Sequence, residues 1–485
     1  MKPNNSHFNF DNSYRKLSEK FYAEVNPFPA PDPEMLLLNE DLLKDLDLGN
    51  TDKKELIKIL SGNQLAIGSE PIAQAYAGHQ FGHFTMLGDG RALLLGEHLT
   101  DSGKRWDIQL KGSGQTPFSR RGDGKATLKS MLREYLMSET MHHLGIPTSR
   151  SLAVLKSGEK VFRETTQDGG ILTRVMKSHI RIGTFEFARY FGGIDHVKEL
   201  MNYTIDRHFP ELRDVENPAF ALLEKVMDLQ MDLIVNWMRV GFIHGVMNTD
   251  NTAISGETFD YGPCAFMGVY NPDTVFSSID TQGRYAFGNQ PNIIKWNLAR
   301  LAETLIPLID SDEKKAIEIA TEKIQEFDSK FTEKWYKMYG EKLGFGELKV
   351  GDDQLMDELL RLMEIHQKDY THMFTFLRIP EILNENQFFL DEKWDAWTAK
   401  WKQRIQIGKG GKQAAFELMK KNNPVFIPRN FYVEEALEAA NNGDLSQFNQ
   451  LLELLKSPYD FVPEMKKFLY APDSFDSEYV TFCGT

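Results

Sequence analysis

The stretch from His244 to Gly262, HGVMNTDNTAISGETFDYG, carries the residues that decide the fold. It contains Asn251 and Asp260, whose amide and carboxylate oxygens are hard ligands suited to Mg²⁺, an ion that usually keeps waters and substrate phosphates in its shell. The preceding residues, 220–241, place apolar side chains at helical spacing and lead the chain into this stretch. The sequence therefore predicts a metal-binding loop that follows a helix.

The order of residues in this stretch matches the catalytic and metal-binding loops of protein kinases, H-R-D-L-x-x-x-N followed by D-F-G. Aligned without gaps, His244 takes the His position, Asn251 the Asn position and Asp260-Tyr261-Gly262 the D-F-G position. The position of the kinase base is held by Val246, and a valine side chain cannot accept a proton. The stretch therefore predicts metal binding without the usual kinase base.

The segments on either side predict two lobes of different kinds. Before residue 185 the pattern is mainly one of short strands, with a hairpin closed by the turn TDSGK and one prominent amphipathic helix over 128–145. After that helix we expect three strands, at 151–158, 160–166 and 169–176. Beyond residue 185 the periodicity becomes helical, with long helical segments expected around 313–340 and 353–377.

We therefore predict an α+β, protein-kinase-like bilobal fold with a small β-rich N-lobe containing one main helix, a larger helical C-lobe and a C-terminal extension. The Pro-rich stretch NPFPAPDP is expected to be a connector. The expected boundaries are 1–182 for an N-terminal extension and the β-rich nucleotide-binding lobe, 183–430 for the helical catalytic lobe with its catalytic and metal-binding loops, and 431–485 for a C-terminal helical extension and tail.

The composition is that of a soluble globular protein too long for one ordinary core. The chain has 485 residues, of which 26% are charged and 41% hydrophobic, and its net charge is −14. This charge argues against nucleic acid and against an anionic membrane surface as partners. No apolar run reaches the roughly 18–20 residues that cross a bilayer, and the first residues lack a secretory or transit signal, so we expect a cytoplasmic protein.

A kinase-like nucleotide site also needs a glycine-rich turn, a strand lysine and an acidic partner on the next helix. Gly88 and Gly90 supply the turn, although a plain β-turn explains the same residues. Lys111 ends a strand at a suitable distance downstream, although a lone lysine is usually solvated surface. Glu134 lies on the following helix, with Glu139 as its competitor. The correct order of these signals predicts nucleotide and divalent-metal binding.

Two histidines raise the alternative of a zinc site. His79 and His83 are spaced as zinc ligands can be, in AGHQFGHF. Their surroundings in the sequence lack the Cys, Asp or Glu residues that would complete a tetrahedral set. We therefore expect packed or hydrogen-bonded histidines here.

Long stretches of the chain resemble the selenoprotein O family, whose members are kinase-fold proteins that transfer AMP to protein hydroxyls. The resemblance runs from FDNSYRKL to the last residues, and it implies that ATP binds flipped, with its terminal phosphates buried and its α-phosphate presented to the acceptor. It also implies that Asp250, beside Asn251, accepts the proton. The motifs that carry it are YAGHQFGHFTMLGDGRA, DIQLKGSGQTPFSRRGDGKA, LTRVMKSHIRIGTFE, GFIHGVMNTDNTAI, FDYGPCAF, GNQPNIIKWNLARLAE and TFCGT.

The resemblance extends to individual nucleotide- and metal-binding residues. Arg174 and Arg181 match arginines that grip the buried phosphates, a role suited to the planar guanidinium, although without the resemblance surface ion pairs would be the preferred interpretation. The metal would be Mg²⁺, with Mn²⁺ as the alternative, held by Asn251 and Asp260. With the kinase-derived Glu134 included, the expected nucleotide-binding set is Gly88, Gly90, Arg91, Lys111, Asp123, Gly124, Glu134, Arg174, Arg181 and Asp260.

The chain has only two cysteines, Cys264 just after the D-Y-G triplet and Cys483 near the C-terminus. From the sequence alone they are either two unrelated thiols or a redox clasp, since cytosolic disulfides tend to be transient or regulatory. Family members with both cysteines resemble a redox-controlled enzyme in which a disulfide holds the tail against the activation-loop region. The resemblance thus implies a redox tail in 431–485.

Three functions follow from these observations. The first is an ATP-dependent, magnesium-assisted protein adenylyltransferase that acts on Ser, Thr or Tyr hydroxyls. The second is a conventional kinase that uses Asp250 as an unorthodox base, and the third is a nucleotide-binding pseudokinase scaffold. The sequence does not choose between ATP and UTP, and it does not identify the substrate proteins. Self-modification and a monomeric state are compatible with it.

Overall fold

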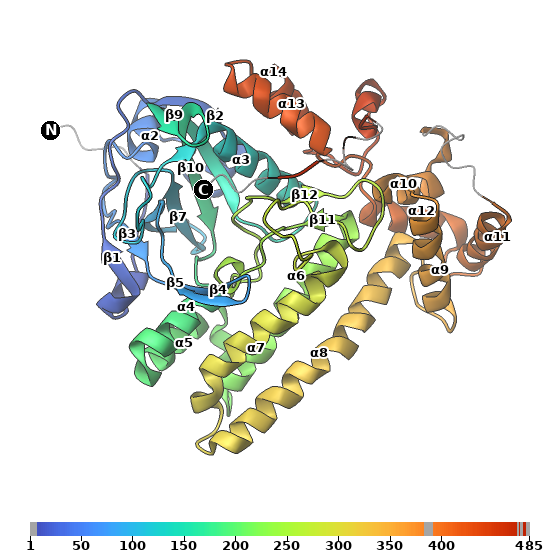
Figure 1. Ribbon diagram of the computed structural model, residues 1–485, viewed down its shortest axis with the longest axis horizontal. Coiled ribbons are helices and arrows are strands. Elements are labelled where there is room, and N and C mark those ends of the chain that lie inside the picture. Colours follow the sequence, from blue (N-terminus) through green and yellow to red (C-terminus); the bar gives the residue numbers. More distant parts are fainter. Residues whose placement is uncertain (1–6, 383–390, 473–474, 476–478, 482–485) are drawn as a thin grey trace.

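The fold is that of a β-rich N-terminal lobe joined to a larger helical part, as predicted (Figure 1). The structure is a computed structural model, and it describes residues 7–382, 391–472, 475 and 479–481. The strands are β1 Tyr22–Glu24, β2 Glu34–Leu38, β3 Ile72–Gln74, β4 Ala77–Gln80, β5 His83–Met86, β6 Ala92–Leu99, β7 Arg105–Lys111, β8 Ala126–Thr127, β9 Arg150–Phe162, β10 Thr166–Met176, β11 Phe242–Ile243 and β12 Ala265–Phe266.

One sheet forms the body of the N-terminal lobe, with strand order β1-β3-β6-β7-β10-β9-β2 and β8 paired to β10. The strands β1 and β2 from the start of the chain lie at its two opposite edges. The Pro-rich stretch 26–33 therefore connects one edge of the sheet to the other, which fits its expected role as a connector. An edge position suits these N-terminal strands because only one side of each needs a hydrogen-bonded neighbour.

The centre of the sheet confirms the predicted hairpin but corrects the strands after it. β6 and β7 pair antiparallel with Leu99 opposite Arg105, so TDSGK is the hairpin turn. The segments 151–158 and 160–166 are not two strands, because 150–162 forms the single strand β9, antiparallel to β10. Gly158, with φ of +80°, lies where the register with β10 shifts between Lys156 and Lys160, an irregularity that glycine accommodates because it adopts positive φ without the steric cost that other residues meet.

The helical part contains the long helix predicted around 313–340, and a second predicted helix is divided in two. The expected helix over 353–377 is broken between Ile365 and Tyr370 into α9 and α10. The helices are α1 Glu40–Asp45, α2 Lys53–Leu60, α3 Leu128–His143, α4 Ile182–Phe187, α5 Ile194–His208, α6 Pro218–Val240, α7 Gln290–Ile309, α8 Glu313–Lys342, α9 Asp352–Ile365, α10 Tyr370–Arg378, α11 Glu392–Gln406, α12 Gly411–Asn422, α13 Asn430–Asn441 and α14 Ser446–Leu454.

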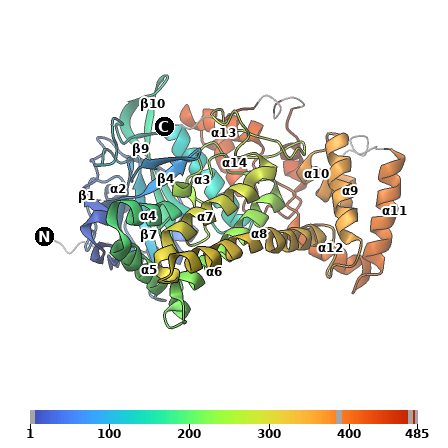
Figure 2. The ribbon, with the colours of Figure 1, turned by 60° about the horizontal axis from the view of Figure 1, so that its bottom comes forward.

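Three long helices, α6, α7 and α8, pack against one another and form the core of the helical part (Figure 2). α6 ends at Gly241, whose left-handed conformation turns the chain into β11 and the stretch that begins at His244. The helices α9 to α12 lie at the far end of α8 from the sheet (Figure 2). This arrangement holds the stretch 244–262 between the helical core and the β-rich lobe.

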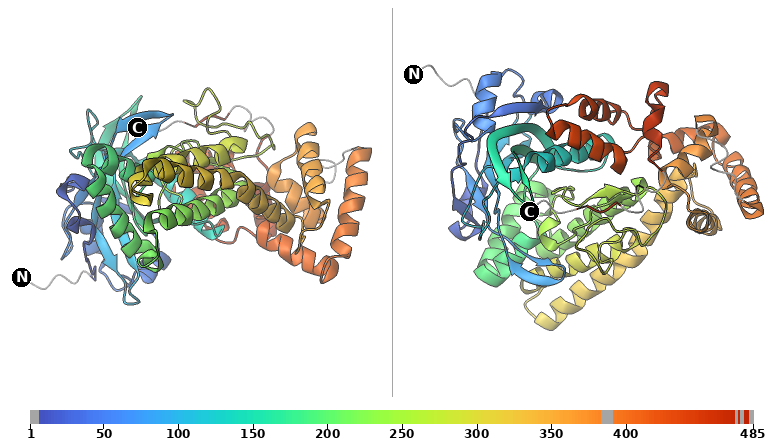
Figure 3. Two further views of the ribbon diagram at one scale, coloured as in Figure 1. Left: turned by 90° about the horizontal axis from the view of Figure 1, so that it is seen from below. Right: turned by 45° about the horizontal axis from the view of Figure 1, so that its top comes forward.

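The main helix of the β-rich lobe, α3, packs against β9 and β10 and is buried along almost its whole length. Thr127 caps its first turn by accepting a hydrogen bond from the Ser130 amide. The C-terminal helix α13 packs against the other side of α3, and Figure 3 shows both α13 and α14 over this lobe. The C-terminal extension therefore covers the helix that carries Glu134.

Among the residues that the structure describes, none of the helices has the length and apolar character needed to cross a membrane.

Candidate nucleotide and metal site

Four of the predicted site residues meet in one ionic cluster at the junction of the lobes. Lys111, at the end of β7, places its Nζ 2.7 Å from Glu134 Oε2 on α3 and in contact with Asp260. Arg174, on β10 beside β7, donates from Nε to Glu134 Oε1 at 2.9 Å and from a terminal nitrogen to Asp260 Oδ1 at 3.1 Å. The cluster joins sheet, helix and D-Y-G loop as the kinase pattern requires.

Glu134, not its competitor Glu139, is the partner of Lys111. Glu139 is engaged elsewhere, since its carboxylate accepts hydrogen bonds from Arg150 and Asn39. Burial alone would raise the pKa of Glu134, but Arg174 and Lys111 lower it below its usual value. Glu134 is therefore ionised and fixes the two cations in place.

Asp260 combines an unusual backbone with a strongly stabilised charge. Its φ is +63°, in the left-handed region that few non-glycine residues adopt, and such conformations concentrate at functional sites. Burial opposes ionisation, but Lys111, Arg174 and Arg91 hold the pKa of this carboxyl well below its usual range. About a third of its side chain remains exposed, so the ionised carboxylate can still reach a ligand.

Arg181 is a further buried cation near the cluster, and its guanidinium lies against two aromatic rings. Its guanidinium carbon lies 3.9 Å from the centroid of the Tyr76 ring and 4.9 Å from that of Phe259. It also donates to the backbone carbonyl of Asp250 at 3.2 Å and to Asp89 Oδ1 at 3.4 Å. Arg174 and Arg181 are thus buried residues of the site, and the surface ion pairs considered as their alternative are wrong.

Asp250 is buried and closely surrounded by backbone. Its Oδ1 has no hydrogen-bond partner among the described residues. Gly78 of β4 lies against it, since a Cβ there would come within 2.9 Å of the Asp250 Cβ, and Gly183 of α4 approaches its Cα. Burial is the main cause that raises the pKa of Asp250 to about 6, with the charge of Arg181 opposing the shift.

A hydrogen-bonded network from β4 and α4 holds the loop that carries Asp250. Thr249 Oγ1 donates to Glu186 Oε2 at 2.5 Å and accepts from the His79 amide at 2.8 Å, and the His79 ring contacts Glu186 Oε1. Burial raises the pKa of Glu186 to about 7. His79 is thus a hydrogen-bonded histidine as expected, and His83 is exposed on β5.

The residues expected to hold Mg²⁺ fit that ion by their chemistry. Asn251 donates from Nδ2 to the Val246 carbonyl at 3.1 Å, which leaves its Oδ1 available as an acceptor. Val246, in the kinase-base position, is buried. Within the described ranges no group of three or more His, Cys, Asp or Glu side chains could hold a metal ion. Asn251 and Asp260 are the sparse oxygen set with which Mg²⁺ is usually held, substrate phosphates supplying further ligands.

Gly88 and Gly90 lie in the turn between β5 and β6, where neither position has room for a side chain. A Cβ on Gly88, whose φ is +148°, would lie 2.6 Å from the Phe118 ring, and one on Gly90 would lie 3.0 Å from the Phe118 carbonyl oxygen. The turn is therefore packed under the segment around Phe118. Arg91 follows it, close enough to Asp260 to lower the pKa of that carboxyl.

Asp123 and Gly124 take a different position. Asp123 accepts hydrogen bonds from Arg163 at 2.9 and 3.1 Å and from the Lys125 amide, and neither of these partners belongs to the ionic cluster. Gly124 has φ of +68° and pairs with Gly114 through the backbone. These contacts order the loop after β7 and leave its nucleotide contact a prediction.

The C-terminal tail reaches the segment after the D-Y-G triplet. Thr481 donates from its amide to the Phe276 carbonyl at 2.7 Å and from Oγ1 to the Pro263 carbonyl at 2.7 Å. Cys264, the next residue after Pro263, is buried. Cys483 lies outside the described residues, so the expected pairing of the two cysteines stays a prediction.

Sequence reasoning missed several residues that shape the site. Asp89 is buried between the two turn glycines and accepts from Gln74, and Asn248 accepts from the Phe81 amide at 3.1 Å and the Tyr285 hydroxyl at 2.6 Å. Glu186 of α4 supports the loop that carries Asp250, through its hydrogen bond from Thr249. A signal for Asp89 was its place in the G-D-G turn, whereas nothing local in the sequence distinguishes Glu186 from a surface carboxylate.

The comparisons with known proteins agree over almost the whole chain. The profile of the family described as "Protein adenylyltransferase SelO" matches residues 4–456. The "Protein nucleotidyltransferase YdiU" of Anoxybacillus flavithermus is 51% identical over 485 residues, covering 99% of this chain and 100% of that protein. The protein of the same name from Bacillus cereus strain G9842 is 52% identical and covers 100% of both chains. The one from Pelagibacter ubique is also 52% identical and covers 99% of both chains.

One solved structure that matches is described as "ROP2 from Toxoplasma gondii: A virulence factor with a protein-kinase fold and no enzymatic activity". It is 9% identical and covers 75% of this chain and 95% of that one, with a TM-score of 0.24, too low to support an argument. The family profile and the close relatives are sufficient without it. The chain belongs to the protein adenylyltransferase SelO family, a family of nucleotidyltransferases.

Proposed function

We propose that this protein transfers AMP from ATP, with Mg²⁺, to Ser, Thr or Tyr hydroxyls of protein substrates. The observation that carries the proposal is the position of Asp250. It is a buried carboxylate with one oxygen free of hydrogen bonds, beside the ionic cluster, while the kinase-base position holds the apolar side chain of Val246. A site built for γ-phosphoryl transfer would need its base at Val246.

In the proposed reaction the acceptor hydroxyl oxygen attacks the α-phosphorus of ATP. The bond from that phosphorus to the β,γ-pyrophosphate breaks, a phosphodiester forms between acceptor and AMP, and pyrophosphate leaves. The hydroxyl proton passes to the Asp250 carboxylate. A pKa of about 6 suits this role because the carboxylate is mostly ionised at neutral pH yet basic enough to accept the proton.

Three buried cations are available to neutralise the phosphates of ATP. Lys111, Arg174 and Arg181 are held by Glu134, Asp260 and the aromatic rings, so they need little rearrangement when phosphates bind. Mg²⁺ bound through Asn251 and Asp260 would neutralise further phosphate charge. The burial of Arg174 and Arg181 supports an ATP orientation in which the terminal phosphates enter the protein and the α-phosphate faces Asp250.

We also propose that the tail regulates the site through a disulfide between Cys264 and Cys483. Supporting this, the hydrogen bond from Thr481 to the Pro263 carbonyl places the tail two residues short of Cys483 beside the residue before Cys264. Oxidation of the two thiols would release two protons and pass two electrons to an oxidant such as oxidised glutathione. Comparing AMP transfer in reduced and oxidised protein, with Cys264→Ser as the insensitive control, tests this part.

The proposed function is tested with ATP labelled either on the α- or on the γ-phosphate. We expect label on acceptor protein only from α-labelled ATP, and loss of labelling in Asp260→Ala and Asn251→Ala variants. Labelling only from γ-labelled ATP would instead identify a kinase. Nucleotide binding without label from either position would leave a pseudokinase scaffold.

A further inference from the structure

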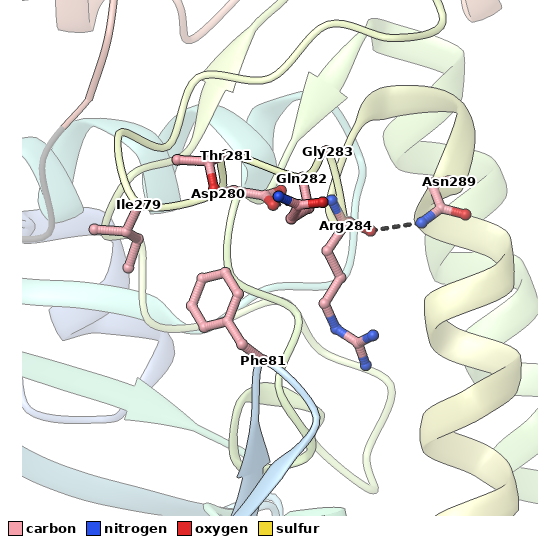
Figure 4. Close-up of a pocket in the computed structure, with 8 residues that line it drawn as sticks. All are labelled: Phe81, Ile279, Asp280, Thr281, Gln282, Gly283, Arg284 and Asn289. Carbon is pink, nitrogen blue, oxygen red and sulfur yellow. Dashed lines mark hydrogen bonds between the residues drawn. The ribbon is translucent and has the colours of Figure 1, made fainter.

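A cavity of about 570 Å³ lies beside the catalytic loop, outside the ionic cluster. It is formed by the tip of the β4–β5 hairpin and by the segment before α7 (Figure 4). The Phe81 ring lies between Ile279 and the Arg284 side chain, beneath the backbone of 280–283 (Figure 4). The volume of the cavity is in the range of pockets that bind ligands.

The cavity contains a cation that its own surroundings do not neutralise. Asp280 is the acidic residue that lines the cavity. Its carboxylate accepts hydrogen bonds from the backbone amides of Arg284 at 2.8 Å and Tyr285 at 2.7 Å. Arg284 forms no ion pair within the described ranges. Its side chain hydrogen-bonds the uncharged Tyr285 hydroxyl, and its buried Nε has no hydrogen-bond partner in the described part of the chain. Its guanidinium carbon lies 5.0 Å from the Trp296 ring, which orients it without cancelling its charge.

The cavity is tied to the catalytic loop by the same elements that enclose Asp250. The Phe81 amide and the Tyr285 hydroxyl both donate to Asn248, two residues before Asp250. Gly78 of β4 lies against Asp250, and Phe81, the residue after β4, lines the cavity. At a rise of about 3.3 Å per extended residue, Gly78 and Phe81 are at most about 10 Å apart, the span of three residues.

We propose that this cavity binds the acceptor segment of the protein substrate, with an acidic side chain at Arg284 and an apolar contact on Phe81. The proposal rests on the proposed AMP transfer and specifies its substrate. An extended segment bound in this way presents its hydroxyl to Asp250 about three residues from the acidic side chain. An Arg guanidinium recognises a carboxylate through paired hydrogen bonds, so it selects acidic over basic neighbours.

A protein occupant fits the surface beside the cavity better than a small molecule does. The second strand of the hairpin, β5, exposes Phe84. Its ring packs edge-to-face on the exposed ring of Tyr190, with centroids 4.9 Å apart, and stacks on that of Phe191 at 6.2 Å. Exposed aromatic residues gathered in this way are typical of protein-binding surfaces. They extend the contact area well beyond a bound side chain.

The test uses synthetic peptides with a single Ser, Thr or Tyr and with Asp or Lys placed at successive positions on either side. We expect Asp about three positions from the hydroxyl to raise kcat/KM about tenfold over Lys, mainly through KM. Arg284→Glu should reverse the preference and Arg284→Lys should keep it. Both variants should bind ATP as the wild type does, which shows that they are folded.

The outcomes separate this inference from the function on which it rests. An unchanged Asp preference in Arg284→Glu, or no charge preference in a wild type that labels these peptides, would overturn the cavity assignment. Labelling of intact proteins but of no peptide would also overturn it. If nothing is labelled, fluorescence anisotropy of the Asp peptide decides, since binding lost in Arg284→Glu supports the cavity while the AMP-transfer proposal fails, and equal binding removes both.

Discussion

At the scale of single residues, the ionic cluster decides what the site can bind. Glu134 contacts both Lys111 and Arg174, and all three side chains are buried. Buried ion pairs contribute little net stability when intact, but removing one partner leaves charges without compensation. Asp260 also contacts both cations, and if it holds Mg²⁺ as proposed, Glu134 is the carboxylate left to balance their charge.

We expect Glu134→Gln to lower the free energy of unfolding by about 3 kcal/mol, because Lys111 and Arg174 lose their buried counter-charge. Urea denaturation measures this change. The matched control is Glu358→Gln, whose partner Lys400 lies 3.1 Å away on the surface, where an ion pair is worth about 0–1 kcal/mol. Equal effects of the two substitutions would contradict the importance of the cluster.

A second residue-scale prediction concerns pH. Burial raises the pKa of Glu257 from its usual 4.5 to about 7, while Ser255 donates to it at 2.7 Å. Between these pH values the folded state holds a proton that the unfolded state has lost, so the wild type loses stability as pH rises. Glu257→Gln removes this loss, and its stability relative to wild type should increase by about 3 kcal/mol from pH 4.5 to 7.

Thermal unfolding of both proteins across that pH range measures the difference. The gain should level off above pH 7, where Glu257 is ionised in both states of the wild type. A difference that does not depend on pH would show that Glu257 titrates normally.

At the scale of elements, the close approach of β4 and α4 fixes Asp250. A side chain at Gly78 would collide with the Asp250 side chain, and one at Gly183 would collide with the Ala77 carbonyl of β4 and approach the Asp250 backbone. Gly78→Ala should therefore displace the Asp250 carboxylate and lower kcat for AMP transfer by about 100-fold, with ATP affinity nearly unchanged, since displacement of a reacting group by about 1 Å can reduce rates that much.

The control is Gly346→Ala, where a Cβ would meet no atom within 4 Å. Steady-state kinetics together with ATP-binding titration separate the two effects. Equal kcat values for the two glycine variants would show that the approach of β4 is not what positions Asp250.

The sequence predicted elements well where local chemistry decides them. Helical periodicity predicts α6, and turn residues predict the β6–β7 hairpin. Spacing predicts the order of the site residues Lys111, Glu134, Asn251 and Asp260. The merged strand β9 could not be predicted, because its pairing with β10 resumes on both sides of the irregularity at Gly158, and that long-range pairing is not visible in the local sequence. The role of Arg284 also depends on folding, which brings the hairpin tip and the segment before α7 together.

At the scale of the whole molecule, the C-terminal part braces the helix that carries Glu134. Arg133, next to Glu134 on α3, donates to Glu434 on α13 at 3.0 Å and to the Cys264 carbonyl at 2.7 Å. Tyr479 of the tail donates to the same Glu434 at 2.7 Å. The position of α3 therefore depends on both α13 and the tail.

Glu434→Ala should lower the free energy of unfolding by about 2 kcal/mol and reduce AMP transfer, because Arg133 is buried and loses its ionic partner. Glu438→Ala, one turn further along α13, is the control, since Glu438 is mostly exposed and lies 3.7 Å from Lys129. Denaturation and transfer assays on both variants check the expectation, which fails if Glu438→Ala has the larger effect.

The proposed function requires that the protein transfers AMP, and not phosphate, to its acceptor. Intact-protein mass spectrometry distinguishes the two. The chain is incubated with ATP and Mg²⁺, with and without a generic acceptor protein, beside Asp250→Ala and Asp260→Ala variants. We predict an AMP-sized adduct that both variants lose, with pyrophosphate released in equal amount. A phosphate-sized adduct with ADP as the second product would contradict the account.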